Sequence, residues 1–273
     1  MKEILTTHCG SLPFVDISRA IDFTFLFDIP TLFTLPQLDP NQFMGRDLIY
    51  LLNIGDPQKL KLTSNYLESQ VNILPFYADA FFDEFKKNKA QRFKYQLIGP
   101  YTFYKMLNLA SDINRVDIGK FLLDKYSILL NTFNSYGDCL FVLDEPMLNL
   151  AHRDEVEWLN RFAKQLGSID GVTIGFHICS KQTAETLTQL RNFSLYLDYE
   201  LYTKEEIIQM DMVNFIGIDT SGSRHLPNEI TFMRNKASDQ CLIAPSCGLA
   251  LHNQEKLSDV WHFLNQTKQL LLD

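Results

Sequence analysis

The sequence predicts a single (β/α)8 barrel of the TIM type over residues 1–273, with a helical insertion after the second strand. Two observations predict this fold class. Short apolar runs alternate along the chain with amphipathic stretches of helical periodicity, which is typical of parallel strands joined by right-handed crossovers. Eight such units fit into 273 residues, and a barrel of this type typically needs about 250.

The predicted strands are short apolar runs, and the helices between them carry apolar residues at helical spacing. The strands are Glu3–Thr7, Thr31–Leu35, Phe93–Ile98, Cys139–Leu143, Val172–Phe176, Ser194–Tyr199, Val213–Ile218 and Cys241–Ala244. The helices are Asp16–Phe27, Asp117–Tyr136, Asp154–Leu166, Lys181–Leu190, Lys204–Met210, Asn228–Asn235 and Lys256–Leu272. The stretch Ile54–Ala90 is rich in Phe and Tyr and is predicted to be an inserted helical pair.

A doubly wound open sheet is the alternative architecture for this alternation. That fold commonly carries a Gly-x-Gly-x-x-Gly turn after its first strand. The segment after the first predicted strand reads His8-Cys9-Gly10-Ser11-Leu12-Pro13 and has no such turn. The barrel is therefore the favoured fold.

The composition excludes several classes of partner. A formal net charge of −8, a pI near 5.3 and the lack of a Lys or Arg run argue against a nucleic-acid-binding protein. No apolar run reaches the roughly 20 residues that span a bilayer, and residues 1–8 do not resemble a signal peptide. We expect a cytoplasmic protein without a membrane partner, in which the five cysteines are free thiols.

Thiol and imidazole side chains lie near the ends of separate predicted strands. His177 and Cys179 follow the fifth strand, and Cys247 follows the eighth. Residues two apart on a strand share a face, so His177 and Cys179 can reach one metal ion together. Thiolates, an imidazole and a carboxylate select zinc, and an incomplete protein ligand set is typical of catalytic zinc. The alternative explanation is structural, because buried cysteine often packs as a small apolar residue.

Polar residues follow nearly every predicted strand, where a barrel holds its active site. Individually they have simpler explanations: Asp144 can cap a helix, and Gly99-Pro100 can form a turn. Their shared placement at one end of the barrel favours an active site. The segments, in strand order, are His8–Pro13, Pro36–Gln37, Gly99–Thr102, Asp144–Pro146, His177–Cys179, Asp198–Glu200, Asp219 and Cys247.

Five motifs, in this order, resemble the catalytic barrel of cobalamin-independent methionine synthase. They are Gly10-Ser11-Leu12-Pro13, Ile98-Gly99-Pro100-Tyr101-Thr102, Asp144-Glu145-Pro146, His177-Ile178-Cys179 and Pro245-Ser246-Cys247-Gly248-Leu249. The resemblance extends from Thr6 to Leu249 and is greatest to short single-barrel relatives in the uroporphyrinogen decarboxylase/methionine synthase superfamily.

The resemblance implies a zinc-dependent methyltransferase that methylates a thiol, homocysteine, to form methionine. It implies that zinc is bound by His177, Cys179, Cys247 and a carboxylate. Glu200 is the best match for the carboxylate because it follows the strand after the His-x-Cys motif, and Asp198 is the alternative.

The same resemblance implies the substrate-binding and catalytic residues. Ser11, Thr102 and Asp144 correspond to segments that hold the amino-acid substrate, with Asp144 also a catalytic candidate. Gln37 stands where the family has a glutamate that binds the substrate amino group. The family also has a proton-donating histidine after strand seven. His225, four residues beyond the matching place, is the candidate here.

The methyl donor and two alternative functions remain open. The chain lacks the duplicated half that helps the long enzymes hold folate, so a methyl-corrinoid or a partner protein is the expected donor rather than methyltetrahydrofolate. A lyase like uroporphyrinogen decarboxylase would need a cationic cleft, and few Lys or Arg residues lie at the predicted mouth. A non-catalytic barrel that binds zinc or a partner protein is the other alternative, supported by the uncharged Gln37.

Overall fold

The computed structural model describes residues 3–39, 42, 74–108, 114–203, 205–206, 213–218 and 237–273. The strands are β1 (Glu3–Thr6), β2 (Thr31–Leu32), β3 (Arg92–Ile98), β4 (Asp138–Asp144), β5 (Val172–Ile178), β6 (Ser194–Asp198), β7 (Val213–Ile218) and β8 (Ala237–Pro245). The α-helices are α1 (Ile17–Thr24), α4 (Ala78–Lys87), α5 (Pro100–Asn108), α6 (Arg115–Phe133), α7 (Arg153–Leu166), α8 (Ala184–Leu190) and α11 (Leu257–Leu272). Short 3₁₀ helices among the described residues are η3 (Leu148–Leu150), η4 (Tyr199–Leu201) and η5 (Gln254–Lys256).

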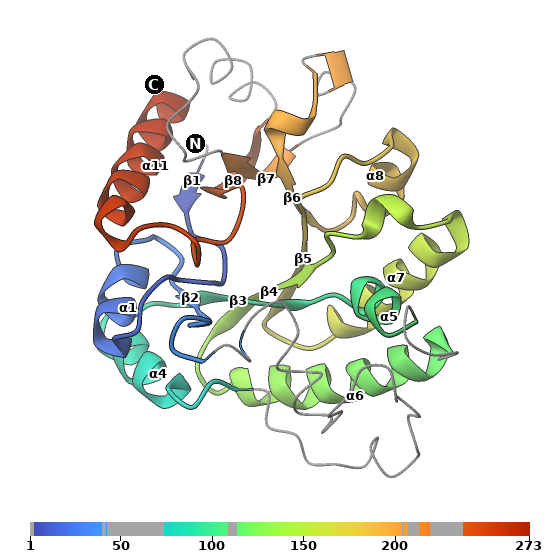
Figure 1. The fold of residues 1–273 in the computed structure, drawn as a ribbon, viewed down its shortest axis with the longest axis horizontal. Helices are drawn as coiled ribbons and strands as arrows, with labels where there is room; N and C mark the ends of the chain where they lie inside the picture. The colour runs from blue at the N-terminus through green and yellow to red at the C-terminus, as the bar shows by residue number, and fades with distance from the viewer. Residues whose placement is uncertain are drawn as a thin grey trace.

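The eight strands form one parallel sheet in the order β1-β8-β7-β6-β5-β4-β3-β2. The sheet curls, and the helices lie outside it (Figure 1). Among the described residues no ladder joins β1 to β2, but Ser11 and Thr34, which follow these strands, form an isolated parallel bridge. The chain therefore has an α/β fold like a TIM barrel, in which the strand ladder is open between β1 and β2.

All eight predicted strands are present, with shifted ends. The largest shifts are in β8, which begins at Ala237, and in β2, which ends at Leu32. Part of the predicted insertion is also helical, as α4. Residues 43–73, most of the predicted helix at 204–210 and the whole of the one at 228–235 lie outside the described residues. The sequence did not predict α5, which begins at Pro100.

Local capping explains where several helices begin. The Asp16 carboxylate accepts hydrogen bonds from the backbone N–H groups of Ser18 and Arg19, at 2.8 and 3.3 Å, and so begins α1. At α7, Glu155 reaches back to accept from the His152 backbone N–H at 2.8 Å. No helix in the described ranges is both long and apolar enough to cross a bilayer.

Two apolar cores lie on opposite faces of the sheet. The larger one fills the space between strands and helices, and aromatic side chains such as Phe81, Phe93 and Phe133 dominate it. The smaller one lies inside the curled sheet and consists of Cys9, Leu140, Val142, Tyr196, Phe215 and Ala244. The small inner core leaves room for polar side chains inside the barrel.

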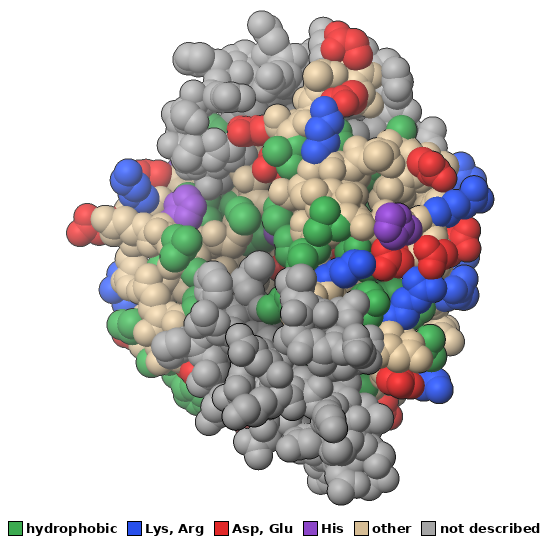
Figure 2. All heavy atoms as spheres, turned by 45° about the vertical axis from the view of Figure 1, so that its right-hand side comes forward, with side chains coloured by type: hydrophobic (Ala, Val, Ile, Leu, Met, Phe, Trp, Pro, Cys, Tyr) green, Lys and Arg blue, Asp and Glu red, His purple; other side chains and the backbone are tan. Residues whose placement is uncertain are grey.

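On the face of the molecule in Figure 2, acidic and basic side chains are interspersed toward the right-hand edge.

The Asp28 carboxylate links β1, at the open edge of the sheet, to the C-terminal helix α11. Its carboxylate accepts hydrogen bonds from the Thr6 backbone N–H at 2.7 Å and the Thr6 hydroxyl at 2.8 Å. The Lys268 ammonium on α11 donates to the same carboxylate at 2.7 Å. Burial alone would raise the pKa of Asp28, but the hydrogen bonds from Lys268 and Thr6 hold it below the usual value of 3.8. This contribution to stability is present above pH 3.8 and is lost as the pH falls through the lower, folded-state pKa.

We predict that Asp28→Ala lowers the free energy of unfolding by about 1–2 kcal/mol, because it leaves the buried Thr6 N–H without its acceptor. Urea denaturation measures this change. Glu84→Ala, which removes a surface ion pair with Lys87, is the matched control and should leave stability close to that of the wild type. Equal effects of the two substitutions would contradict a structural role for the contacts of Asp28 with Thr6 and Lys268.

Candidate functional site

Residues from six strand ends line one cavity of about 280 Å³ at the carboxyl end of the sheet. They come from the last residues of β1, β2, β3, β4, β5 and β8 or from the segments that follow these strands, which the chain separates widely. The polar members are Cys9, Ser11, Thr34, Gln42, Gln96, Thr102, Asp144, His177, Cys179 and Cys247. This location is where barrel enzymes hold their reacting groups.

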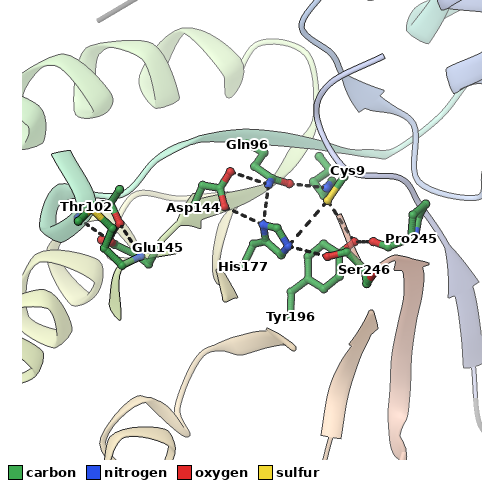
Figure 3. Close-up of polar contacts among 11 residues, drawn as sticks. Cys9, Gln96, Thr102, Asp144, Glu145, His177, Tyr196, Pro245 and Ser246 are labelled. Atoms are coloured by element: carbon green, nitrogen blue, oxygen red, sulfur yellow. Dashed lines mark hydrogen bonds and ion pairs between the residues drawn. The ribbon is translucent and has the colours of Figure 1, made fainter. Parts of the chain in front are cut away.

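Strand register brings His177 beside Asp144 and Tyr196. The parallel ladders pair Asp144 with His177 and His177 with Tyr196. The ring nitrogen Nδ1 of His177 donates to Asp144 Oδ1 at 2.7 Å, and Nε2 donates to the backbone carbonyl of Ser246 at 3.0 Å (Figure 3). The amide nitrogen of Gln96 donates to Asp144 Oδ2 at 3.3 Å and lies 3.2 Å from the same Nδ1.

The surroundings of His177 favour its charged form. Burial lowers the pKa of the imidazole, but the electrostatic interactions with Cys9 and Asp144 and the hydrogen bond with Asp144 outweigh it. The pKa of His177 therefore lies well above its usual value of 6.5. The Cys9 sulfur lies 4.0 Å from Nε2 and 3.2 Å from the Tyr196 hydroxyl. His177 thus faces a carboxylate on one side and a thiol on the other.

Cys179 and Cys247 line the same cavity. The interaction with Cys247 raises the pKa of Cys179 above its usual range. The interaction with Cys179 and the nearby charge of His177 lower the pKa of Cys247 to about 6, although burial opposes this shift. A thiol with a lowered pKa is a good nucleophile and a good ligand for a soft metal.

Ser11 and Thr102 line the cavity, and Gln37 does not. A Cβ atom on Gly248 would lie 2.2 Å from the Ser11 hydroxyl, so the glycine makes room for that hydroxyl. The Thr102 hydroxyl already donates to Glu145 at 2.6 Å. Gln37 donates to the Ala250 carbonyl at 3.0 Å. Its side chain lies in a separate surface cleft, lined by Arg19, Gln37, His252, Asn253, Gln254 and Glu255.

The structure does not bring the predicted carboxylate ligands into the cavity lining. Glu200 lies exposed in η4, and its backbone N–H donates to the Asp198 carboxylate at 3.2 Å. Neither Glu200 nor Asp198 lines the cavity with Cys179 and Cys247. In the part of the chain that the structure describes, no group of three or more His, Cys, Asp or Glu side chains is arranged to hold a metal ion. His225 lies outside the described residues.

The sequence reasoning assigned no role to Glu145 and Cys9, although both lie in segments predicted at the active-site end, and it did not single out Gln96 or Tyr196. Glu145 is fully buried and caps α5, because its carboxylate accepts from the backbone N–H groups of Tyr101 and Thr102 at 2.9 and 2.7 Å. A Cβ atom on Gly99 would lie 2.1 Å from this carboxylate, which explains the glycine. For Gln96 a signal was available, because the polar residues Lys94 and Gln96 lie two apart in an otherwise apolar strand and so share its inner face.

Comparison with known proteins supports the fold. No protein-family model and no curated protein matches the chain. Among solved structures, the chain is similar to a B12-independent methionine synthase from Shewanella sp. W3-18-1, determined in complex with selenomethionine. The TM-score is 0.53 at 13% sequence identity, and the match covers 70% of this chain and 66% of the other, just under two thirds of its length. At this identity, the likeness shows a shared fold.

We predict that Glu145 makes stability fall as the pH rises toward neutrality. Burial raises the pKa of Glu145 from 4.5 to about 7, although hydrogen bonds from Thr102 and Tyr101 oppose the shift. The folded state therefore binds an extra proton between these values, and this stabilisation is lost as the pH rises through about 7.

Between about pH 4.5 and 7, the free energy of unfolding of the wild type should fall by up to about 3 kcal/mol relative to that of Glu145→Gln, whose amide does not titrate. Urea denaturation across this range measures the difference. Glu157→Gln, on the exposed part of α7, should keep the wild-type slope. Parallel curves for the wild type and Glu145→Gln would contradict a buried, titrating Glu145.

Proposed function

We propose that the chain is a zinc-dependent methyltransferase that methylates a thiol, with homocysteine as acceptor and methionine as product. The donor is a methyl-corrinoid or a methyl-carrying partner protein rather than methyltetrahydrofolate. The observation that carries this proposal is that Cys179 and Cys247 line one cavity together with His177 and Asp144. The distant likeness to a methionine synthase barrel supports it.

The donor chemistry of the cavity fits zinc. The two thiols and the imidazole that line the cavity are soft and borderline ligands, which select zinc over magnesium or calcium. His177, Cys179 and Cys247 are the proposed ligands, and the sequence resemblance adds Glu200 or Asp198 as a carboxylate. Bound zinc supplies positive charge that lowers the pKa of a coordinated thiol.

The remaining residues orient the reacting groups. Asp144 accepts from Nδ1 of His177 and so directs Nε2 away from itself, as carboxylates commonly do behind a metal-bound histidine. The Asp144 side chain is 19% exposed and lines the cavity, so it can also contact a substrate ammonium. Leu97, Ile98 and Pro146 give the cavity apolar walls. Such walls reduce access of water to a thiolate and strengthen the charged contacts.

Methyl transfer itself tests the function. Zinc-loaded protein is incubated with L-homocysteine and either methylcobalamin or methyltetrahydrofolate, and methionine is quantified by mass spectrometry. We expect methionine from the corrinoid donor and little from the folate. If zinc-loaded protein, alone and with cell extract as a source of donor proteins, forms no methionine, the chain is a non-catalytic barrel.

We predict that Cys247→Ser reduces zinc content at least about tenfold, because it removes one thiolate from the ligand set. Metal analysis after dialysis against a weak chelator measures this loss. Cys139→Ser is the matched control, since Cys139 is buried in β4 and does not line the cavity. Undiminished zinc in Cys247→Ser would reject Cys247 as a ligand.

We also predict that Asp144→Asn selectively weakens binding of an amino-acid thiol. A charge-assisted hydrogen bond contributes about 1.5–3 kcal/mol, so homocysteine should lose about tenfold more affinity than an amine-free thiol. Titration of L-homocysteine and mercaptoethanesulfonate into the cobalt-substituted protein measures both affinities. The ratio cancels any common effect on the metal through His177. An unchanged ratio would exclude contact between Asp144 and the ammonium.

A further inference from the structure

We propose that Gln42 determines ligand specificity by donating a hydrogen bond from its amide nitrogen to the carboxylate of an amino acid bound in the cavity. This inference rests on the proposed function for the class of ligand, and it adds the residue that recognises the carboxylate. Gln42 follows β2 and lines the cavity together with Asp144. An amino acid therefore finds an anion for its ammonium and a neutral donor for its carboxylate in the same cavity.

Contacts within the segment after β2 fix the orientation of the Gln42 amide. The backbone N–H of Gln42 donates to the Asp39 carbonyl at 2.9 Å. The backbone N–H of Leu35 donates to Gln42 Oε1 at 2.8 Å. Because a backbone N–H is only a donor, the amide atom that faces Leu35 must be the oxygen. The Tyr77 hydroxyl also lies 2.8 Å from Oε1 and 2.8 Å from the Phe33 carbonyl, so its proton can go to either oxygen.

The amide nitrogen of Gln42 is thereby directed to the cavity as a donor. Gln42 is only 9% exposed, and within the described ranges this nitrogen has no hydrogen-bond partner. The unpartnered side-chain atoms that are closed off from solvent there are the hydroxyl oxygens of Tyr101 and Tyr199 and Oε1 of Gln189. The Gln42 nitrogen is not one of them, and it is therefore open to the cavity that the residue lines. A nearly buried donor without a partner in the protein favours a ligand that supplies an acceptor.

The other side-chain nitrogens in the described lining already have partners within the protein. They belong to Gln96 and His177. The amide nitrogen of Gln96 donates to Asp144 at 3.3 Å (Figure 3). The two ring nitrogens of His177 donate to Asp144 and to the Ser246 carbonyl. Since no Lys or Arg is among the described lining residues, a carboxylate depends on neutral donors, and Gln42 offers two N–H groups.

Calorimetric titration of two ligands tests this assignment. The ligands are L-methionine and 3-(methylthio)propylamine, which has the same side chain and ammonium but no carboxylate. The wild type should bind L-methionine at least about tenfold more tightly, because a hydrogen bond to a charged acceptor is strong. Gln42→Glu keeps an oxygen for Leu35 and replaces the donor with a second oxygen. At about pH 8, where a carboxyl is ionised, it should remove this preference by weakening L-methionine alone.

A second variant and a matched control separate the donor from its surroundings. Gln42→Leu removes the donor without adding charge and should also remove the preference; if it does not fold, Gln42→Glu decides. Gln37→Leu is the control, because Gln37 also follows β2 but donates to Ala250 and does not line the cavity. It should keep the wild-type preference. An unchanged preference in the folded Gln42 variants, or equal weakening of both ligands, would overturn the inference.

The two proposals fail in different ways. If the preference for L-methionine depends on Gln42 but the methyl-transfer assay forms no methionine, the proposed activity is lost and the assignment of Gln42 stands. If methionine is formed but the Gln42 variants keep the wild-type preference, the activity stands and the assignment is rejected. A wild type that binds L-methionine no more tightly than the amine also rejects it.

Discussion

One constraint governs the buried polar side chains inside the curled sheet: each of them must find its hydrogen-bond partner within the protein. Lys94 is fully buried, and its ammonium donates to the Gln96 side-chain oxygen at 2.9 Å. Its charge also lies 5.6 Å from the ring of Tyr196. Burial lowers the pKa of Lys94 to about 8. Because Lys94 takes the amide oxygen of Gln96, the amide nitrogen must face Asp144.

These hydrogen bonds hold the side chains of Asp144 and His177 in fixed positions in the cavity wall. Asp144 is held by Gln96 and in turn orients His177. The next residue, Glu145, ties the end of β4 to the start of α5 through buried hydrogen bonds. The same short segment therefore orients the imidazole and anchors a helix. Groups held on strand ends by such contacts keep their geometry better than groups on loops.

Features of the fold that depend on local periodicity were predicted from the sequence. Features that depend on contacts between residues far apart in the chain were not. Parallel strands place their carboxyl ends together, so Asp144, His177, Cys179 and Cys247 were predicted to share one site, and they line one cavity. Glu200 follows a strand end, where the two-residue alternation stops and η4 leaves it exposed. Helix α5 was missed because its cap, Glu145, lies 44 residues from Tyr101, and Gly99-Pro100 on its own is typical of a turn.

The charge of the cavity limits which ligands it can hold. Asp144 is the single carboxylate among its described lining residues, and no Lys or Arg is among them. A polycarboxylate therefore meets no Lys or Arg in the described lining, where the imidazole of His177 is the group that can carry a positive charge. For the proposed amino-acid thiol, the cavity offers the thiols of Cys179 and Cys247 and an anion at Asp144. Gln37 is bonded to Ala250 and does not line the cavity. In the proposed function, recognition of the ammonium would therefore depend on Asp144, which His177 and Gln96 already hold in place.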